Sequence, residues 1–203
     1  MAIEAVREQV PTRSWCPISL GVLLILGNAS CAPSSSAESA AMTKGDVVFS
    51  GGHDTDPQDH GRPVVLIAHA LDVKPEVFRQ AFSGVTPSRT GPPTPSRARA
   101  NKKVLMDALG KYGVTNDRLD EVSDYYRYNP QSGELWTHTP ASATAIIQDG
   151  KVTGFKITNP GSGYTTPPTV RVIGYDGLNV EAQIEFTTDL NTNGQVISLT
   201  LKK

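Results

Sequence analysis

The spacing of apolar residues changes once along the chain. Between residues 46 and 129 apolar residues recur at helical intervals, whereas between 135 and 202 they alternate with polar residues, as along strands. A turn-rich joint at 129–133 (Asn-Pro-Gln-Ser-Gly) separates the two patterns. The pattern predicts an α+β fold, in which a small helical domain at 46–130 precedes a small antiparallel β-sheet or sandwich domain at 135–203.

We expect about four short helices in the first domain. The segment 62–71 is apolar with proline in its first turn, which favours a helix, although its β-branched residues leave a strand as the alternative. The segment 75–82 opens with Pro-Glu and gathers its apolar residues on one face. Ser96 is expected to cap a third helix that runs to residue 110 or 112, and Asn116 to cap a fourth.

The second domain carries period-two segments separated by turn residues. The pair Asp149-Gly150 lies between two apolar alternations, which is a strong signal for a β-hairpin. Alternation in the fourth segment predicts one buried face and one solvated face. The expected strands are 143–147, 152–157, 169–173, 180–186 and 196–201.

A glycine-rich motif lies between the second and third of these strands. Residues 157–170 read Ile-Thr-Asn-Pro-Gly-Ser-Gly-Tyr-Thr-Thr-Pro-Pro-Thr-Val, and residues 145–174 resemble the Gly-Ser-Gly-Tyr β-module of bacterial surface and phage structural proteins. That resemblance implies an architectural role and brings no catalytic residues. The glycines permit a sharp turn that the ring of Tyr164 can cover. Around 51–57 and 112–119 the chain is similar to uncharacterised exported bacterial proteins, which implies no activity.

The N-terminal region has the layout of an export signal. An apolar run at 17–26 precedes small residues and Cys31. At about ten residues, the run is half the length of about 20 that a membrane-spanning helix needs. The segment 26–31 resembles the lipobox of bacterial lipoproteins, with Asn28 where that family usually has Leu. We therefore expect a signal peptide at 1–30, a lipid on Cys31 and attachment to the membrane through that lipid.

The residues that follow Cys31 fit a flexible tether. Residues 31–45 are small and polar, and their composition cannot bury a core. The predicted location is the cell envelope, periplasmic or extracellular and membrane-anchored. Two alternatives stay open: ordinary cleavage, for example after Ala29, or translation from Met42, which would leave the protein in the cytoplasm.

The net charge and the positions of the cysteines argue against a nucleic-acid partner and against a zinc–cysteine site. The formal net charge is −1 and no basic patch stands out, so a nucleic-acid partner is not expected. The only cysteines are Cys16 and Cys31, both in the export region. The folded part therefore has no cysteine for a disulfide or a zinc–cysteine site.

The densest polar cluster is the segment 53–60, His-Asp-Thr-Asp-Pro-Gln-Asp-His. Its oxygen and nitrogen ligands could suit calcium or zinc, although an EF-hand loop would need Gly at its sixth position and Glu at its twelfth. The alternative is structural: Asp59 or His60 caps the helix at 62–71, and Asp54 and Asp56 form turns with their own backbone. The candidate metal ligands are His53, Asp54, Asp56, Asp59 and His60.

Other polar and aromatic residues have simpler interpretations. His69 is expected at the edge of the core. The aromatic run 125–128, with Trp136, could present a sugar-stacking or partner surface, or pack the helical half against the sheet. Motifs for a serine hydrolase, a phosphate-cradling loop or a dinucleotide fold are missing.

The sequence therefore predicts an exported, lipid-anchored envelope protein with a binding or structural role. A protein or glycan partner is possible, and no catalytic motif is identifiable. The alternative is a metal-binding protein or metal-dependent hydrolase that uses the segment 53–60.

Overall fold

The computed structural model describes residues 43–86, 93–128 and 132–202. The predicted signal peptide at 1–30, the lipidation at Cys31 and nearly all of the predicted tether lie outside these residues. In the described part of the chain, no helix is both long and apolar enough to cross a membrane.

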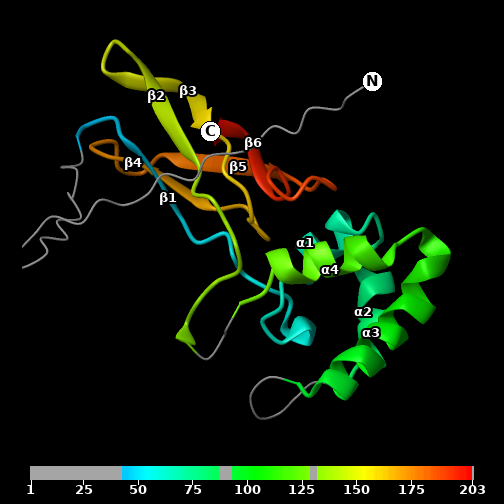
Figure 1. Ribbon diagram of the computed structural model, residues 1–203. Coiled ribbons are helices and arrows are strands. Elements are labelled where there is room, and N and C mark those ends of the chain that lie inside the picture. The colour runs from blue at the N-terminus through cyan, green and yellow to red at the C-terminus, as the bar shows by residue number, and fades with distance from the viewer. Residues whose placement is uncertain (1–42, 87–92, 129–131, 203) are drawn as a thin grey trace, which may run out of the picture. The chain divides into compact units, whose positions relative to one another are not determined.

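The α+β fold class is confirmed, with four α-helices in the described residues (Figure 1). The segment 62–71 is helical, as expected. Its helix begins after Pro63, whose ring fixes a backbone angle close to that of a helix. The helices are α1 (Val64–Ala70), α2 (Pro75–Ser83), α3 (Pro95–Leu109) and α4 (Asn116–Tyr125), with short 3-10 turns η1 (Pro57–Asp59) and η2 (Gly110–Tyr112).

Threonines cap the third and fourth helices, so the predicted caps Ser96 and Asn116 are wrong. The hydroxyl of Thr94 accepts a hydrogen bond from the backbone N–H of Arg97 at 3.4 Å, and that of Thr115 accepts one from Arg118 N–H at 3.2 Å. In both helices the capping side chain lies three residues before the N–H that it binds, as N-cap geometry requires.

All five predicted strands are present, and a sixth, β1 (Val47–Ser50), lies in the segment that we expected to be helical. β1 pairs antiparallel with β4, so that Val47 faces Val172 and Ser50 faces Thr169. A four-residue strand is too short to show a period in the sequence. The other strands are β2 (Ser142–Gln148), β3 (Lys151–Asn159), β4 (Thr169–Val172), β5 (Asn179–Glu185) and β6 (Gln195–Lys202).

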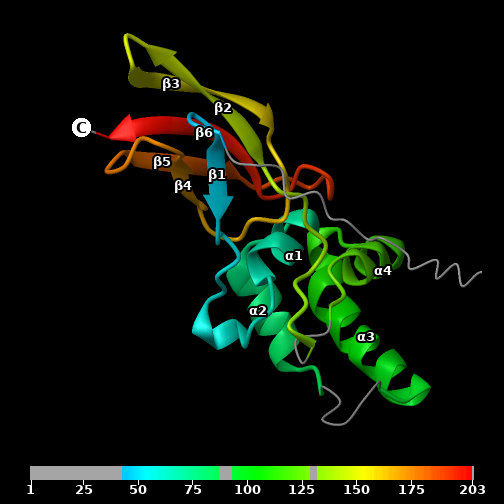
Figure 2. The same ribbon diagram turned by 90° about the vertical axis from the view of Figure 1, so that its left-hand side faces the viewer.

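The strands form three two-stranded antiparallel ribbons, β1–β4, β2–β3 and β5–β6 (Figure 2). An isolated bridge between Asp46 and Thr144 links the start of β1 to β2, and β3 lies beside β6 and β4 beside β5. The ribbons therefore enclose one apolar core, whose buried members are Ala141, Tyr164, Val170, Ala182 and Val196.

A second core lies among the helices. Leu66 of α1, Leu109 of α3 and Val122 of α4 are fully buried there. Trp136 and Leu190 belong to the same cluster, although both come from the C-terminal half of the sequence. The helical core is therefore completed by residues that follow the joint at 129–133.

Buried polar contacts join the helices to the strands. The side-chain amide of Asn193, just before β6, donates to the carbonyl of Leu66 at 2.8 Å and to the hydroxyl of Tyr126 at 2.9 Å. The indole N–H of Trp136 donates to the carbonyl of Gly163 at 2.8 Å. These bonds confirm that aromatic residues near the joint pack the two halves together. His69 stacks on Phe186 and is half-buried, as expected for a residue at the edge of the core.

The Gly-Ser-Gly-Tyr segment lies at the centre of these contacts. Tyr164 is only 3% exposed, and its hydroxyl accepts a hydrogen bond from the backbone N–H of Ala141 at 2.9 Å. Gly163 has a φ of +83°, and a Cβ added there would lie 2.6 Å from Cβ of His138. Only glycine fits both requirements. The segment is architectural in this chain, whereas its likeness to the β-module family stays a prediction.

Candidate functional site

The polar segment 53–60 belongs to a loop that leads from β1 to α1. The loop leaves the strand through Gly51 and Gly52, which have φ values of +68° and +84°. The carbonyl of Gly52 accepts hydrogen bonds from the backbone N–H groups of Thr165 at 2.9 Å and Thr166 at 3.2 Å. The loop is therefore tied to the strand-rich half at one end and continues into the helices at the other.

Asp59 forms a buried ion pair with Arg79 of α2. The carboxylate is bound through both oxygens, at 2.7 Å from Nε and 2.8 Å from a terminal nitrogen of the guanidinium. Its side chain is 4% exposed, and hydrogen bonding to it raises the pKa of Arg79. Both carboxylate oxygens are thus occupied by one cation, in the geometry that strengthens Arg–carboxylate pairs.

The expected cap of α1 by Asp59 or His60 is wrong. α1 begins after Pro63 and has no side-chain cap. His60 is exposed with a φ of +51°, and its backbone N–H closes the η1 turn on the carbonyl of Pro57 at 3.3 Å.

The other two carboxylates of the loop behave differently from each other. Asp56 accepts a hydrogen bond from the backbone N–H of Gln58 at 3.0 Å, so its predicted local turn is confirmed. That bond and one from the Gln58 side chain hold the pKa of Asp56 below its usual value. The same prediction is wrong for Asp54. Its carbonyl accepts from the hydroxyl of Thr165 at 2.7 Å and its carboxylate from that of Thr166 at 3.3 Å.

A pocket of ≈ 330 Å³ lies between this loop, the start of α1 and residues 165–166. A neighbouring pocket of ≈ 440 Å³ shares Asp59, Arg62 and Arg79 with it. Arg62 lines both pockets: its guanidinium stacks over Phe82, with 4.7 Å between the charge centre and the ring centre, and donates to the carbonyl of Asp59. The first pocket offers carboxylates, guanidiniums and hydroxyls beside apolar side chains, including Asp54, Asp56, Arg62, Val65, Arg79 and Thr166.

His53 lies apart from this pocket, in what we call the aromatic enclosure: His53, Trp136, His138 and Tyr164. Its ring stacks on Tyr164 with centroids 5.1 Å apart and lies 4.9 Å from the ring of His138 and 5.9 Å from that of Trp136. Burial lowers the pKa of His53, and the neighbouring His138 lowers it further. The buried Nε2 of His53 has no hydrogen-bond partner within the part of the chain that the structure describes.

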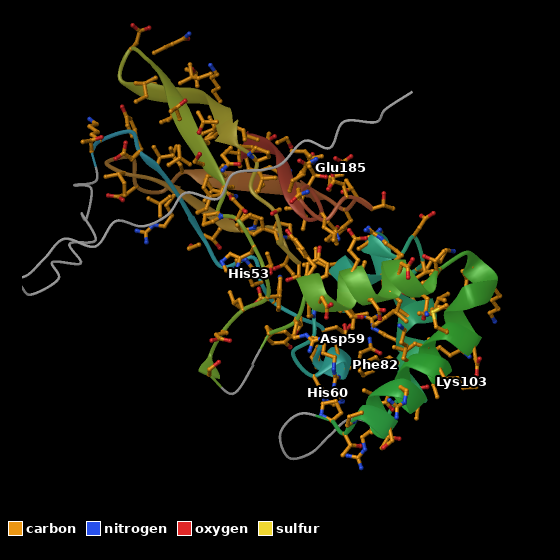
Figure 3. The ribbon with its side chains drawn as sticks, viewed as in Figure 1. His53, Asp59, His60, Phe82, Lys103 and Glu185 are labelled. Carbon is orange, nitrogen blue, oxygen red and sulfur yellow. The ribbon has the colours of Figure 1, made fainter. Side chains whose placement is uncertain are left out.

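The five predicted metal ligands are not brought together. Figure 3 shows His53 on the strand side of the loop, away from Asp59 and His60. Asp59 is held by Arg79, and Asp54 by the threonines. Within residues 43–86, 93–128 and 132–202, no group of three or more His, Cys, Asp or Glu side chains could hold one metal ion. The calcium or zinc alternative stays a prediction.

Several residues of the site were missed in the sequence. Arg79 lies 20 positions from Asp59, and Thr165 and Thr166 lie more than 110 positions from Asp54. His138 reaches His53 only because the segment after Trp136 returns to the loop. Arg79 and His138 have no local motif, and the glycine-rich motif that contains Thr165 and Thr166 gives no sign of a contact with Asp54. A signal for these contacts therefore exists only in three dimensions.

Comparison with protein families, with curated proteins and with solved structures finds no match to this chain. What the site does is therefore argued from its geometry and chemistry.

Proposed function

We propose that this chain is an exported, lipid-anchored envelope protein whose folded part binds a polar ligand in the pocket beside the 53–60 loop. The observation that supports binding best is that partners hold the charged groups of the loop in fixed positions. Asp59 is locked to Arg79, and Asp54 is tied to two threonines across the pocket. These groups form a fixed wall of hydrogen-bonding atoms, which is the preorganisation that binding needs.

The chemistry of the pocket favours a hydroxyl-bearing ligand such as a glycan. Its volume is at the lower end of the range of about 300–1,000 Å³ that small-molecule sites occupy. Three carboxylates and two guanidiniums line the pocket, so their charges nearly balance, which favours a neutral ligand over a strongly charged one. Val65 and neighbouring apolar side chains supply a surface for the face of a sugar ring. A polar peptide segment is the alternative partner of the same chemistry.

The proposed location rests on the sequence. The apolar run at 17–26 and Cys31 fit a processed lipoprotein, and residues 32–42 are long enough to hold a folded part away from a membrane. Wild-type protein should fractionate with membranes, and Cys31→Ala should release it or leave it unprocessed. Soluble, cytosolic behaviour of both would contradict export and favour translation from Met42.

The binding proposal is tested by titrating the purified full chain with soluble envelope glycan fragments in a calorimeter. Thr166→Val should weaken binding about tenfold, because the hydroxyl lines the pocket and holds Asp54. Thr153→Val is the matched control, since that hydroxyl lies on β3, away from the pocket, and donates to the carbonyl of Ile146. Equal affinity of both variants, or no heat with any fragment, would contradict a glycan site here.

A further inference from the structure

Two histidines meet in the aromatic enclosure from segments 85 positions apart. His53 belongs to the loop after β1, and His138 follows Trp136 just before β2. Their ring centroids are 4.9 Å apart and their planes are inclined at 64°. The chain has four histidines in all, and the other two, His60 and His69, lie elsewhere.

The contacts of the two rings indicate which nitrogen of each histidine is available to bind a ligand. Nδ1 of His138 lies 2.9 Å from the carbonyl of Trp136, and since a carbonyl can only accept, Nδ1 donates. The neutral His138 ring therefore presents Nε2 as a lone pair, the form in which histidine binds metals. Nε2 of His53 is buried and has no hydrogen-bond partner among the described residues, so it is free to bind an ion.

We propose that His53 and His138 form a two-imidazole site for a divalent transition-metal ion, such as zinc, copper or nickel, bound through Nε2 of each ring. Imidazole nitrogen suits these ions, whereas calcium and magnesium prefer oxygen. Only His53 is shared with the ligand set predicted from the sequence. Asp59 and His60 play no part. The proposal is independent of the lipid anchor and of the polar pocket.

The separation of the rings fits one shared ion. With a metal–nitrogen distance of about 2.1 Å, an ion lies about 3.2 Å from the centre of each ring. Two imidazoles at angles between about 90° and 109° then place their centres about 4.5–5.2 Å apart. The observed separation of 4.9 Å falls inside this interval. The separation of the ring centres is therefore compatible with one shared ion.

The surroundings of the rings match those of histidine ligands in proteins. A metal-bound histidine usually donates its other ring N–H to a carbonyl or carboxylate, as His138 does to the carbonyl of Trp136. Tyr164 and Trp136 hold the His53 ring in place. His138 is exposed, so an ion can reach the site and water can complete its coordination.

The unpartnered nitrogen is the observation that calls for a ligand. A buried polar atom without a partner is destabilising and uncommon in native proteins. A metal ion would satisfy Nε2 of His53 and join it to His138. An ordered water could satisfy the same atom, and it would not require His138, which makes His138 the residue on which the test turns.

The experiment uses the full chain, freed of metal with a chelator and titrated with zinc, copper or nickel ions in a calorimeter. Wild type should bind one ion per chain, and His138→Ala should weaken that binding at least tenfold. His60→Ala, the same change at an exposed histidine outside the enclosure, should bind like wild type. Added metal should also raise the melting temperature of wild type and His60→Ala, but not of His138→Ala.

Three results would overturn the site: no binding by the wild type, equal binding by His138→Ala, or loss of binding in His60→Ala. Because His138 is exposed, its variant is expected to fold, which far-ultraviolet circular dichroism checks. Copper supplies a separate measurement, since its electron paramagnetic resonance spectrum reports nitrogen ligands directly. A spectrum without imidazole hyperfine coupling would also refute the assignment.

Discussion

Removing the carboxylate of Asp59 should destabilise the protein far more than losing a helix cap would. In the fold, Asp59 is 5% exposed and holds Arg79 through two short hydrogen bonds. Asp59→Ala leaves that guanidinium without its main partner and opens space where the carboxylate was. Asp56 and Glu76 lie 3.8 and 3.7 Å from Arg79, so part of the charge stays compensated.

The expected loss follows from these contacts. Breaking a fully buried ion pair by removing one partner costs about 3–5 kcal/mol. The Arg79 side chain is 25% exposed and water can solvate part of it, so we expect about 2–4 kcal/mol. At about 2–4 °C per kcal/mol for a chain of this size, the melting temperature should fall by roughly 4–16 °C. A lost cap would cost only about 0.5–2 kcal/mol.

The assay is a double-mutant cycle in urea, with Asp59→Ala, Arg79→Ala and the double variant. The two single losses should be non-additive by about 1–3 kcal/mol, because both remove the same interaction. The exposed pair Lys103–Asp107, one helical turn apart on α3, is the control cycle and should couple by no more than about 0.5 kcal/mol. Additive losses at 59 and 79, or a loss below about 1 kcal/mol for Asp59→Ala, would refute the reasoning.

Three further predictions concern the joint between helices and strands. Gly163→Ala should lower the free energy of unfolding in urea by more than about 2 kcal/mol, because the added Cβ meets His138. Gly177 has a φ of +80° and no described atom within 4 Å of an added Cβ, so Gly177→Ala should cost only about 1–2 kcal/mol. Equal losses for the two variants would contradict the contact with His138. Asn193→Ala should lower the free energy of unfolding by about 2–4 kcal/mol, measured by calorimetry, since the carbonyl of Leu66 and the hydroxyl of Tyr126 lose their donor. An unchanged stability would contradict the role of Asn193 in joining helices and strands. Burial raises the pKa of Tyr126, so the unfolded state releases its proton first and stability should fall as the pH rises above about 10. Tyr126→Phe should lessen that alkaline loss in urea midpoints measured between pH 8 and 11, and an unchanged slope would argue against it.

Local patterns in the sequence were enough to predict most elements of the fold. Asp149 and Gly150 have φ values of +48° and +72°, the left-handed pair that an Asp-Gly hairpin turn requires, and β2 and β3 flank them as expected. α2 begins at the predicted Pro75, which suits a first helical position. Each of these features depends on residues a few positions apart, so it could be read without the fold.

Features that depend on distant residues could not be predicted in this way. β1 is defined by its pairing with β4, and four residues of Val, Phe and Ser indicate no structure alone. The loop at 53–60 was recognised as unusual, but its partners were not: Asp59 could be a cap, a metal ligand or half of an ion pair until Arg79 is placed beside it. Only the three-dimensional structure shows which of these roles the carboxylate of Asp59 has.

The pairing of β1 with β4 also determines when the chain can fold. Ser50 and Thr169 are neighbours in this ribbon although 119 positions separate them. At about 5–20 residues per second, a ribosome needs roughly 6–24 s to make the intervening chain. The two apolar cores form even later in synthesis, because the helical core includes Leu190 and the core among the strands includes Val196. A nascent chain therefore holds neither core in its native form until residues 190 and 196 have been added.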